Sequence, residues 1–223
     1  MPSTLAPRLL HFMSTEIQRK ASDYHLLRRL WHFLGVMAMV GLYLFLEKDE
    51  ALWVACGVTL VLGGMDLLRL FIPPLNRVLT RVFKPFLREK EAHGLTAASS
   101  MLIGVTFAIA LFPKDILLLT LGMLAVADPM AALVGIRFGK ERLIGNKSLA
   151  GTTAAFLVCS VLALSYFTYF QLFQDRLLLV TVLVGLIGAL SELVPIFNLD
   201  DNLTFPILSS SLTYGLFYIF GAI

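Results

Sequence analysis

The sequence has few of the residues on which secreted and soluble proteins rely. Only two of its 223 residues are cysteine, and charged side chains make up 15% of the chain against 58% for hydrophobic ones. Cys56 and Cys159 both lie within apolar stretches, which is typical of small buried residues and excludes a disulfide framework. The composition also excludes a soluble globular domain, in which charged residues make up about 25% of the chain.

Several other sequence signals are absent. Residues 1–27 carry scattered charges without a continuous apolar stretch, so no cleavable signal peptide is expected there. No internal repeat or low-complexity segment is evident. We interpret residues 1–27 as a polar or interfacial N-terminal segment and residues 28–223 as a single transmembrane domain.

Long apolar blocks separated by short charged stretches fill most of the chain. A membrane-spanning helix needs roughly 20 apolar residues, so the sequence predicts an all-α, polytopic integral membrane helical bundle with about seven transmembrane helices. The expected spans cover residues 30–46, 51–72, 95–112, 115–136, 151–170, 176–196 and 203–222. Pro129 and Pro195 are expected to interrupt the fourth and sixth spans, because proline lacks a backbone donor and restricts the residue before it.

Lysine and arginine are distributed unequally between the two membrane faces that seven spans create. Fifteen of the 18 fall in residues 1–29, 69–94 and 137–150, which share one face. Those on the other face are Lys48, Lys114 and Arg176. The positive-inside rule therefore predicts a cytoplasmic N-terminus and an extracytoplasmic C-terminus. We expect the protein in the bacterial cytoplasmic (inner) membrane.

Nearly all the unusual polar residues come to the same face, which predicts one polar site at the cytoplasmic membrane boundary. Asp128 is the least ordinary of them, because at 1.5 Å per residue it lies about 18 Å into a span that begins near Ile116. An unpaired carboxylate at that depth neutralises or finds a cation. A structural salt bridge is the alternative, but the nearest basic residue in sequence is Arg137. We expect Asp128 to hold Mg²⁺ or to activate a hydroxyl group.

A basic, glycine-rich loop follows Asp128 and is predicted to bind phosphate. It does not match the Walker pattern, because one extra residue separates Gly139 from Gly145 and Asn146 precedes the lysine. Its glycines still permit close backbone approach, its lysines supply charge, and residues 148–152 begin a helix with free N–H groups. An ordinary cytoplasmic loop is the alternative, weakened by the acid upstream.

Three further carboxylates form an acidic group on this otherwise basic face: Glu192, Asp200 and Asp201. Aspartate and glutamate are natural Mg²⁺ ligands, usually alongside phosphate oxygens and water. We predict that Mg²⁺ or another divalent cation is held by Asp128, Glu192, Asp200 and Asp201. One of the two adjacent aspartates could instead cap the last helix while the other binds metal.

Other polar groups at the span ends have ordinary structural interpretations. Arg28 and His32 are four residues apart on one helix face, as in an interfacial anchor. Asp66 and Arg69, at i and i+3, can neutralise each other. A basic run after residues 73–74 has near-helical spacing and predicts one amphipathic helix on the anionic membrane surface. The members of this run are Arg77, Arg81, Lys84 and Arg88.

In order and spacing these residues resemble the membrane-embedded, CTP-dependent lipid kinase family, which includes dolichol kinase, phytol kinase, the yeast-type diacylglycerol kinase and polyprenol kinase-like proteins. The resemblance covers residues 28–210. Its motifs are Arg28-Arg29-x-x-His32, Asp66-x-x-Arg69, Glu91 with Leu95-Thr96, Asp128-Pro129-x-Ala131-Ala132-x-x-Gly135-x-Arg137-x-Gly139-Lys140, Lys147-Ser148-Leu149-x-Gly151-Thr152, Glu192 with Pro195, and Asp200-Asp201-Asn202-Leu203-Thr204-x-Pro206. The chain departs from the pattern at residues 95–99, where relatives often have Thr-Gly-Ala-Thr.

The resemblance implies phosphoryl transfer from CTP to the hydroxyl group of a membrane lipid alcohol by a single transmembrane kinase domain, residues 28–223. The implied catalytic residues are Asp128, Arg28, Arg29 and His32. The residues implied to bind the nucleotide are Gly135, Arg137, Gly139, Lys140, Lys147, Ser148, Gly151 and Thr152. Supporting roles are implied for Asp66, Arg69, Glu91, Thr96 and Asn202.

We therefore expect a CTP-dependent lipid kinase that converts a polyprenol, dolichol or phytol-like alcohol, or diacylglycerol, into its monophosphate and releases CDP. Its expected partners are the lipid alcohol, the nucleoside triphosphate and membrane lipids, with no nucleic acid. A cytidylyltransferase that forms a CDP-lipid is the close alternative. An ion-coupled transporter using Asp128 and Glu192 is another, disfavoured because the polar residues collect at one face and no inverted repeat is evident.

Overall fold

The structure, a computed structural model, describes residues 27–145, 147–196 and 199–221 of the chain. In this part of the chain the fold is a bundle of helices, and the only strands are two short ones. The predicted N-terminal segment lies outside the described residues apart from residue 27. The all-α class is confirmed.

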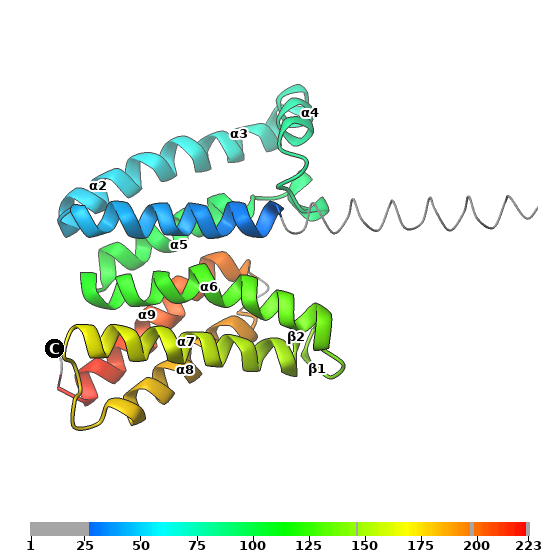
Figure 1. The fold of residues 1–223 in the computed structure, drawn as a ribbon. Helices are drawn as coiled ribbons and strands as arrows, with labels where there is room; N and C mark the ends of the chain where they lie inside the picture. The colour runs from blue at the N-terminus through cyan, green and yellow to red at the C-terminus, as the bar shows by residue number, and fades with distance from the viewer. Residues whose placement is uncertain (1–26, 146, 197–198, 222–223) are drawn as a thin grey trace, which may run out of the picture.

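The helices follow one another through short connections (Figure 1). Residues 27–45 form the first helix. The other elements are α2 (Lys48–Val58), η1 (Thr59–Gly63), α3 (Gly64–Phe71), α4 (Pro73–Val82), η2 (Glu89–Ala92), α5 (Ala97–Leu111), α6 (Lys114–Phe138), β1 (Arg142–Ile144), β2 (Lys147–Ser148), α7 (Leu149–Tyr169), α8 (Leu177–Leu193) and α9 (Asp201–Ile219). α2, η1 and α3 are one continuous helix, Lys48–Phe71, which contains a π-helical turn at η1.

Every predicted span coincides with a helix, but the helices differ in length. Three are long and apolar enough to cross a membrane: Lys48–Phe71, Lys114–Phe138 and Leu149–Tyr169. The apolar helices Ala97–Leu111 and Leu177–Leu193 are shorter. The apolar helical bundle is thus confirmed, while the number of seven spans and the cytoplasmic N-terminus stay predictions.

The prediction that Pro129 interrupts its span is wrong. α6 runs unbroken from Lys114 to Phe138 with Pro129 inside it. Proline removes one backbone hydrogen bond, but α6 packs against α7, α8 and α9, and such tertiary packing outweighs the loss of a single bond. The expectation for Pro195 is confirmed, because α8 ends at Leu193.

α6 is the most enclosed of the three long helices. In an apolar 18-residue segment of α6, half of the residues are buried, against 11% in the corresponding segment of the Lys48–Phe71 helix. α6 packs along α7, α7 packs along α8, and α5 packs against α9. The side chains of Phe167 and Phe205 are fully buried between these helices. The core therefore lies among α5 to α9, and the Lys48–Phe71 helix packs on it through α5.

Small and hydroxyl-bearing residues let the core helices approach closely. Thr120 of α6 and Ser210 of α9 are fully buried and hydrogen-bond to each other at 2.8 Å. A Cβ added at Gly188 of α8 would lie 2.5 Å from the Sγ atom of Cys159, a free and buried thiol. Close approach and interhelical hydrogen bonds are what hold helices together where lipid provides no hydrophobic drive.

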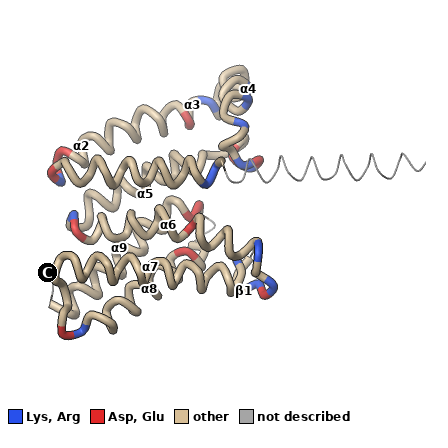
Figure 2. Tube along the Cα trace, viewed as in Figure 1, with Lys and Arg blue, Asp and Glu red and all other residues tan. Residues whose placement is uncertain are grey.

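Charged residues gather toward the two ends of the bundle (Figure 2). Of the described lysines and arginines, Lys48, Lys114 and Arg176 lie at the end where α2, α6 and α8 begin. The others lie toward the opposite end, together with α4 and β1. We call this opposite end the basic end. The unequal distribution is the one on which the predicted membrane orientation depends.

The amphipathic surface helix predicted after residues 73–74 is only partly correct. α4 lies across the basic end of the bundle (Figure 1) and exposes Arg77 and Arg81. It ends at Val82, however, so Lys84 and Arg88 lie beyond it. Pro85 explains the early end, because the residue before a proline is biased away from helix.

The close approach of α5 and α9 gives a first testable prediction. A Cβ at Gly104 would lie 2.5 Å from the Leu203 carbonyl oxygen and 3.0 Å from Cγ of Pro206. We expect Gly104→Ala to lower the free energy of unfolding by about 1–3 kcal/mol, because two packed backbones must move apart. Gly122→Ala in α6 is the matched control, since a Cβ there meets nothing within 4 Å. Thermal unfolding in detergent checks both variants, and equal midpoints would contradict the close approach.

Candidate functional site

A cavity of about 270 Å³ opens at the basic end of the bundle. Its walls come from α6, β2, the start of α7, the end of α8, the start of α9 and Arg88. The predicted site residues that line it are Asp128, Gly135, Lys147, Ser148, Gly151, Thr152, Glu192 and Asp201. The fold therefore brings together carboxylates and phosphate-binding candidates that are up to 73 residues apart in the sequence.

Asp128 faces this cavity from α6. Its carboxylate group lies within electrostatic range of Arg28, His32 and Glu192. Gly135, seven residues later, lies on the same face of the helix. A Cβ at Gly135 would lie 2.9 Å from Oγ of Ser148, so glycine is needed there for α6 to pack against the start of α7. The acid is thus open to the cavity.

A short hairpin returns the basic loop to the cavity. β1 pairs antiparallel with β2, where the loop had been predicted without strands. Gly145 makes the turn with a φ of +56°, in the left-handed region that favours glycine. The hairpin places Ser148 as the N-cap of α7, where its Oγ atom accepts a hydrogen bond from the Gly151 N–H at 3.2 Å.

The N-terminus of α7 opens on the cavity. The first N–H groups of a helix have no intrahelical partner, and the helix dipole favours an anion beside them. Gly139 and Gly151 both pack closely against their neighbours beside the start of α7. A Cβ at Gly151 would lie 2.6 Å from the Ala131 carbonyl oxygen, and one at Gly139 would collide with Ser148. These predicted glycines therefore serve the close packing of α6 against the start of α7.

Lys147 is the cation in the cavity wall. Its ammonium group lies 3.1 Å from Oε1 of Glu192 and 2.8 Å from Oδ2 of Asp201, and it also donates to the Glu192 backbone carbonyl. Burial lowers the pKa of Lys147, but the two carboxylates outweigh this effect, and the net result is a pKa above its ordinary value. Lys147 is therefore charged at neutral pH and joins β2 to the ends of α8 and α9.

The two adjacent aspartates have different positions. Asp200 is the N-cap of α9, where its Oδ1 atom accepts from the backbone N–H and the side-chain amide of Asn202 at 3.2 and 2.7 Å. Its Oδ2 atom lies 3.3 Å from Arg88 and 3.4 Å from Lys90. Burial raises the pKa of Asp200, but Arg88 and Asn202 outweigh it and hold the pKa below its ordinary value. Asp201 is the member of the pair that lines the cavity.

Asp128, Glu192 and Asp201 offer carboxylate oxygens to the cavity. Among residues 27–145, 147–196 and 199–221, no group of three or more His, Cys, Asp and Glu could hold a metal ion by itself. Mg²⁺ commonly takes one or two carboxylates and completes its shell with substrate phosphates and water. The donor set fits a magnesium ion that arrives with a nucleotide better than it fits a closed protein site.

Three residues predicted to bind the nucleotide lie outside the cavity walls: Arg137, Gly139 and Lys140. Arg137 is exposed, with its guanidinium 5.7 Å from the ring centroid of Phe138. Arg137 follows the cavity-lining Gly135 by two residues, a rotation of about 200° around the helix axis, so it lies on the other side of α6. Lys140 borders a separate groove between α6 and α7.

The helix of residues 27–45 approaches Asp128 from the other side. Arg28 and His32 lie within electrostatic range of Asp128, and Arg29 is half-buried on the same turn. Burial lowers the pKa of Arg28. Nε2 of His32 is buried without a hydrogen-bond partner among the described residues. The predicted catalytic residues therefore come near one another, although those on this helix do not line the cavity.

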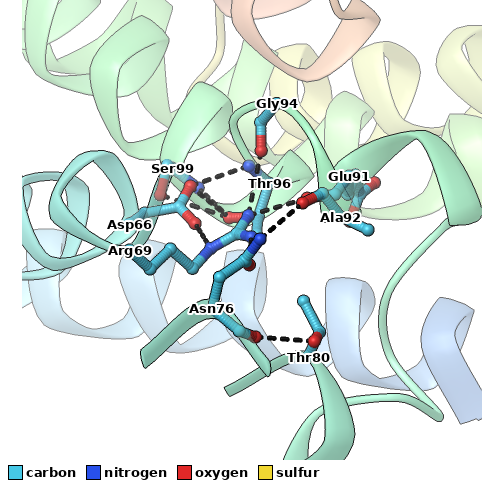
Figure 3. A network of polar contacts seen from close by, with 9 residues as sticks. All are labelled: Asp66, Arg69, Asn76, Thr80, Glu91, Ala92, Gly94, Thr96 and Ser99. Carbon is cyan, nitrogen blue, oxygen red and sulfur yellow. Dashed lines mark hydrogen bonds and ion pairs between the residues drawn. The ribbon is translucent and has the colours of Figure 1, made fainter. Parts of the chain in front are cut away.

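Asp66 and Arg69 neutralise each other as predicted, and they do so inside a larger buried network (Figure 3). Nε of Arg69 donates to Oδ1 of Asp66 at 2.6 Å. The same guanidinium reaches Oδ1 of Asn76 at 2.6 Å and the backbone carbonyls of Glu91 and Gly94 at 2.8 and 2.9 Å. Arg69 thus joins α3, α4 and η2, and its role is structural.

The second oxygen of Asp66 extends the network to α5. It accepts from the backbone N–H and the hydroxyl of Thr96 at 2.7 and 3.0 Å, and Thr96 caps α5 by accepting from the Ser99 N–H at 3.2 Å. The network fixes the segment that carries Glu91. Burial raises the pKa of Glu91, whose Oε1 atom lies 3.8 Å from Nε of Arg88.

Arg88 was not predicted to be a site residue. It lines the cavity and pairs with Asp200, which is 112 residues away in sequence. Because Arg88 belongs to the basic run that predicted a surface helix, it was not recognised as a site residue. Its spacing of three residues from Glu91 was the available signal. Other cavity-lining residues outside the predicted set are Ala131, Ala132, Ile136 and Arg142.

The Arg69 network gives a second prediction. We expect Arg69→Ala to lower the free energy of unfolding by about 3–5 kcal/mol, because the buried Asp66 carboxylate loses its counter-ion. Arg77→Ala on the exposed side of α4 is the control, and it should change the free energy of unfolding by less than about 0.5 kcal/mol. Thermal unfolding in detergent measures both variants. A similar small effect for the two would show that the network does not stabilise the fold.

The Asp200 cap gives a third prediction, with a pH dependence. Asp200→Ala should lower the free energy of unfolding by about 1 kcal/mol at neutral pH. Because the folded-state pKa lies below the ordinary value, the charge-dependent part of this contribution is present in full above about pH 4. It declines as the pH falls through the folded-state pKa. Unfolding midpoints of wild type and variant should converge toward acid, and a constant difference down to the acid limit would contradict this.

Comparison with known proteins agrees with the arrangement of the site. Over 230 residues the chain is 29% identical to CTP-dependent diacylglycerol kinase 1 of Saccharomyces cerevisiae, covering 90% of this chain and 79% of the yeast protein. It is 33% identical to CTP-dependent diacylglycerol kinase 1 of Schizosaccharomyces pombe over 162 residues, which are 67% of this chain and 73% of that protein. It is 28% identical to the chloroplastic farnesol kinase of Arabidopsis thaliana over 234 residues, covering 96% of this chain and 73% of the Arabidopsis protein.

No family model matches the chain, and no solved structure matches it. The yeast relatives are similar over most of their length. The apolar helices agree with a membrane location. The chain therefore belongs to the CTP-dependent lipid kinase family and is a membrane-embedded lipid kinase.

Proposed function

We propose that the protein transfers the γ-phosphoryl group of CTP to the hydroxyl group of a membrane lipid alcohol, giving the lipid monophosphate and CDP. The observation that carries this proposal is the cavity in which Asp128 faces Lys147 and the N-terminus of α7. The relatives named for CTP, diacylglycerol and farnesol support the donor and the class of acceptor.

The triphosphate would bind where positive charge meets the N-terminus of α7. Lys147 and Arg88 supply the charge, and the dipole of α7 adds to it at the start of the helix. Gly135 and Gly151 let α6 pack closely against this helix start. Phosphoryl transfer depends mainly on positioning and on neutralising charge, which these groups provide without moving.

The carboxylates complete the site. One or two of Asp128, Glu192 and Asp201 would hold Mg²⁺ together with the phosphates, and the ion would neutralise charge on the transferred group. Lys147 forms ion pairs with Glu192 and Asp201 in the cavity wall. Asp128 would serve either as a metal ligand or as the acceptor of the hydroxyl proton. Arg28 and His32 lie within electrostatic range of it.

The proposed topology has seven membrane-crossing helices with the N-terminus and the site on the cytoplasmic side of a bacterial inner membrane. The basic end supports it, because the cavity, α4 and nearly all the described lysines and arginines lie there. CTP would enter from the cytoplasm, while the lipid alcohol would reach Asp128 from the bilayer.

A direct assay tests the proposal and forms a fourth prediction. Purified protein in mixed micelles should transfer label from γ-labelled CTP to at least one member of a panel of polyprenols, phytol, farnesol and diacylglycerols, and only with a divalent cation. Asp128→Asn should lower the rate at least 100-fold, since general acid–base and metal roles are each worth that much. Asp115→Asn, at the exposed start of the same helix, is the matched control and should remain fully active.

The products distinguish the alternatives. CDP and a labelled lipid monophosphate support the kinase. Pyrophosphate and a CDP-lipid would instead identify a cytidylyltransferase and contradict the proposal. Full activity of a correctly folded Asp128→Asn variant would remove Asp128 from the mechanism. The residual activity of this variant is then measured at increasing Mg²⁺ concentrations. If Asp128 is a metal ligand, the variant needs more Mg²⁺ than the wild type. If Asp128 is the proton acceptor, the Mg²⁺ requirement is unchanged.

A further inference from the structure

A second cavity, of about 360 Å³, lies between the helix of residues 27–45, the Lys48–Phe71 helix and α5. None of the described residues that line it is charged, and apart from Trp31, Tyr43 and Thr106 they carry no polar side-chain atom other than sulfur. We call this cavity the chain slot. A pocket of this size and composition is typical of sites for apolar ligands.

The chain slot is long enough for a lipid chain. It follows the first helix from Trp31 to Leu46, a distance of about 22 Å at 1.5 Å per residue. This is most of the roughly 30 Å hydrocarbon core of a bilayer. The two helices on its outer side diverge toward the α4 end (Figure 1), and the lining residues Trp31 and Leu62, on the parts of these helices nearer that end, are exposed. The slot is therefore open sideways, in the direction from which a membrane lipid would arrive.

One end of the chain slot adjoins the phosphoryl-transfer site. Trp31 lines the slot, and the next residue, His32, lies within electrostatic range of Asp128. Leu121 of α6 also lines the slot, and Asp128 follows it by seven residues, on the same helix face and about 10 Å along the axis. A chain in the slot can thus have its polar end beside the carboxylate.

The other end is closed. Nζ of Lys114 donates to the carbonyls of Leu44 and Leu46 at 3.3 and 2.7 Å and lies 5.5 Å from the ring centroid of Tyr43. These contacts hold the turn between the first two helices over the end of the slot. The slot therefore has a polar end near Asp128 and a closed end at the opposite side of the bundle, which sets a direction for its ligand.

A π-helical turn lies where the Lys48–Phe71 helix makes its last contact with the chain slot, at Leu62. It covers Thr59–Gly63 and includes Leu62, and Oγ1 of Thr59 lies 2.8 Å from Oγ1 of Thr106 on α5. Such turns occur often at functional sites, because they change which side chains face a neighbour. Here the hydroxyl pair fixes the outer wall against α5 without placing a charge in the slot.

We propose that the chain slot binds one hydrocarbon chain of the lipid alcohol substrate and so holds the hydroxyl group at Asp128. This inference rests on the proposed kinase function. The groove between α6 and α7 is larger, about 720 Å³, but Lys140 and Glu141 border it and Asp128 does not line it. Of these two cavities, the chain slot is the one that combines an uncharged lining with an end near the transfer site.

Two glycines on the first helix provide a matched test. A Cβ at Gly35 would point into the slot with only Cε of Met101 nearby, at 3.9 Å, whereas a Cβ at Gly41 meets nothing within 4 Å and Gly41 does not line the slot. Gly35→Leu should raise KM for a long-chain alcohol tenfold or more and leave KM for its short-chain analogue unchanged, since filling a hydrophobic pocket is worth about 10–200-fold. Gly41→Leu should change neither value.

The substrate pair is dioctanoylglycerol and dioleoylglycerol, or geraniol and phytol, according to the class that the wild type phosphorylates. If Gly35→Leu changed KM equally for the short and long members, or for neither, the proposal that the slot binds the substrate chain would be overturned. If the wild type phosphorylates no alcohol at all, the proposed function fails instead, and the slot is tested by binding.

The binding test uses a diacylglycerol with a diazirine at the end of one acyl chain, without nucleotide. Cross-links should map to the first helix and α5, at residues such as Met39 and Met101, and unlabelled diacylglycerol should displace them. Cross-links in the α6–α7 groove, at Leu157 and Val158, would overturn the proposal. So would equal displacement by phosphatidylcholine, which would identify the slot as a general lipid contact.

Discussion

The ion pairs of Lys147 are the interaction on which the site depends. Its ammonium group lies between Glu192 and Asp201, so it joins the basic hairpin to the ends of α8 and α9. Without this cation, the buried Glu192 carboxylate and the partly exposed Asp201 carboxylate would lose the ammonium group that pairs with both of them. With it, the wall facing Asp128 has fixed charges and a fixed shape, into which a triphosphate and its metal ion can fit.

The bilayer is the constraint that explains why the site lies where it does. Charges are costly in hydrocarbon, so they gather at the ends of the helices, and the basic end carries most of them. The Arg69 network anchors the helix ends there with hydrogen bonds inside the protein. Asp128 is the exception within α6, because its cavity gives it polar surroundings. On the proposed account, the chain slot connects those surroundings to the lipid.

Much of the fold could be predicted from local sequence, and less of the site. The lengths of the apolar blocks located the helices, and the i, i+3 spacing of Asp66 and Arg69 correctly indicated an ion pair. The continuity of α6 through Pro129 could not be predicted, because packing by other helices decides it. The pairing of Arg88 with Asp200 depends on segments 112 residues apart, and no local pattern reports it. The different positions of two adjacent aspartates depend on cap geometry in the same way.

The most direct test of the account is a structure of the protein with a non-hydrolysable CTP analogue, Mg²⁺ and detergent or lipid. The account predicts that the γ-phosphate lies at the N-terminus of α7, within hydrogen-bonding distance of Lys147 and inside the cavity that Asp128 lines. Finding the triphosphate in the groove between α6 and α7, against Lys140 and away from Asp128, would contradict it.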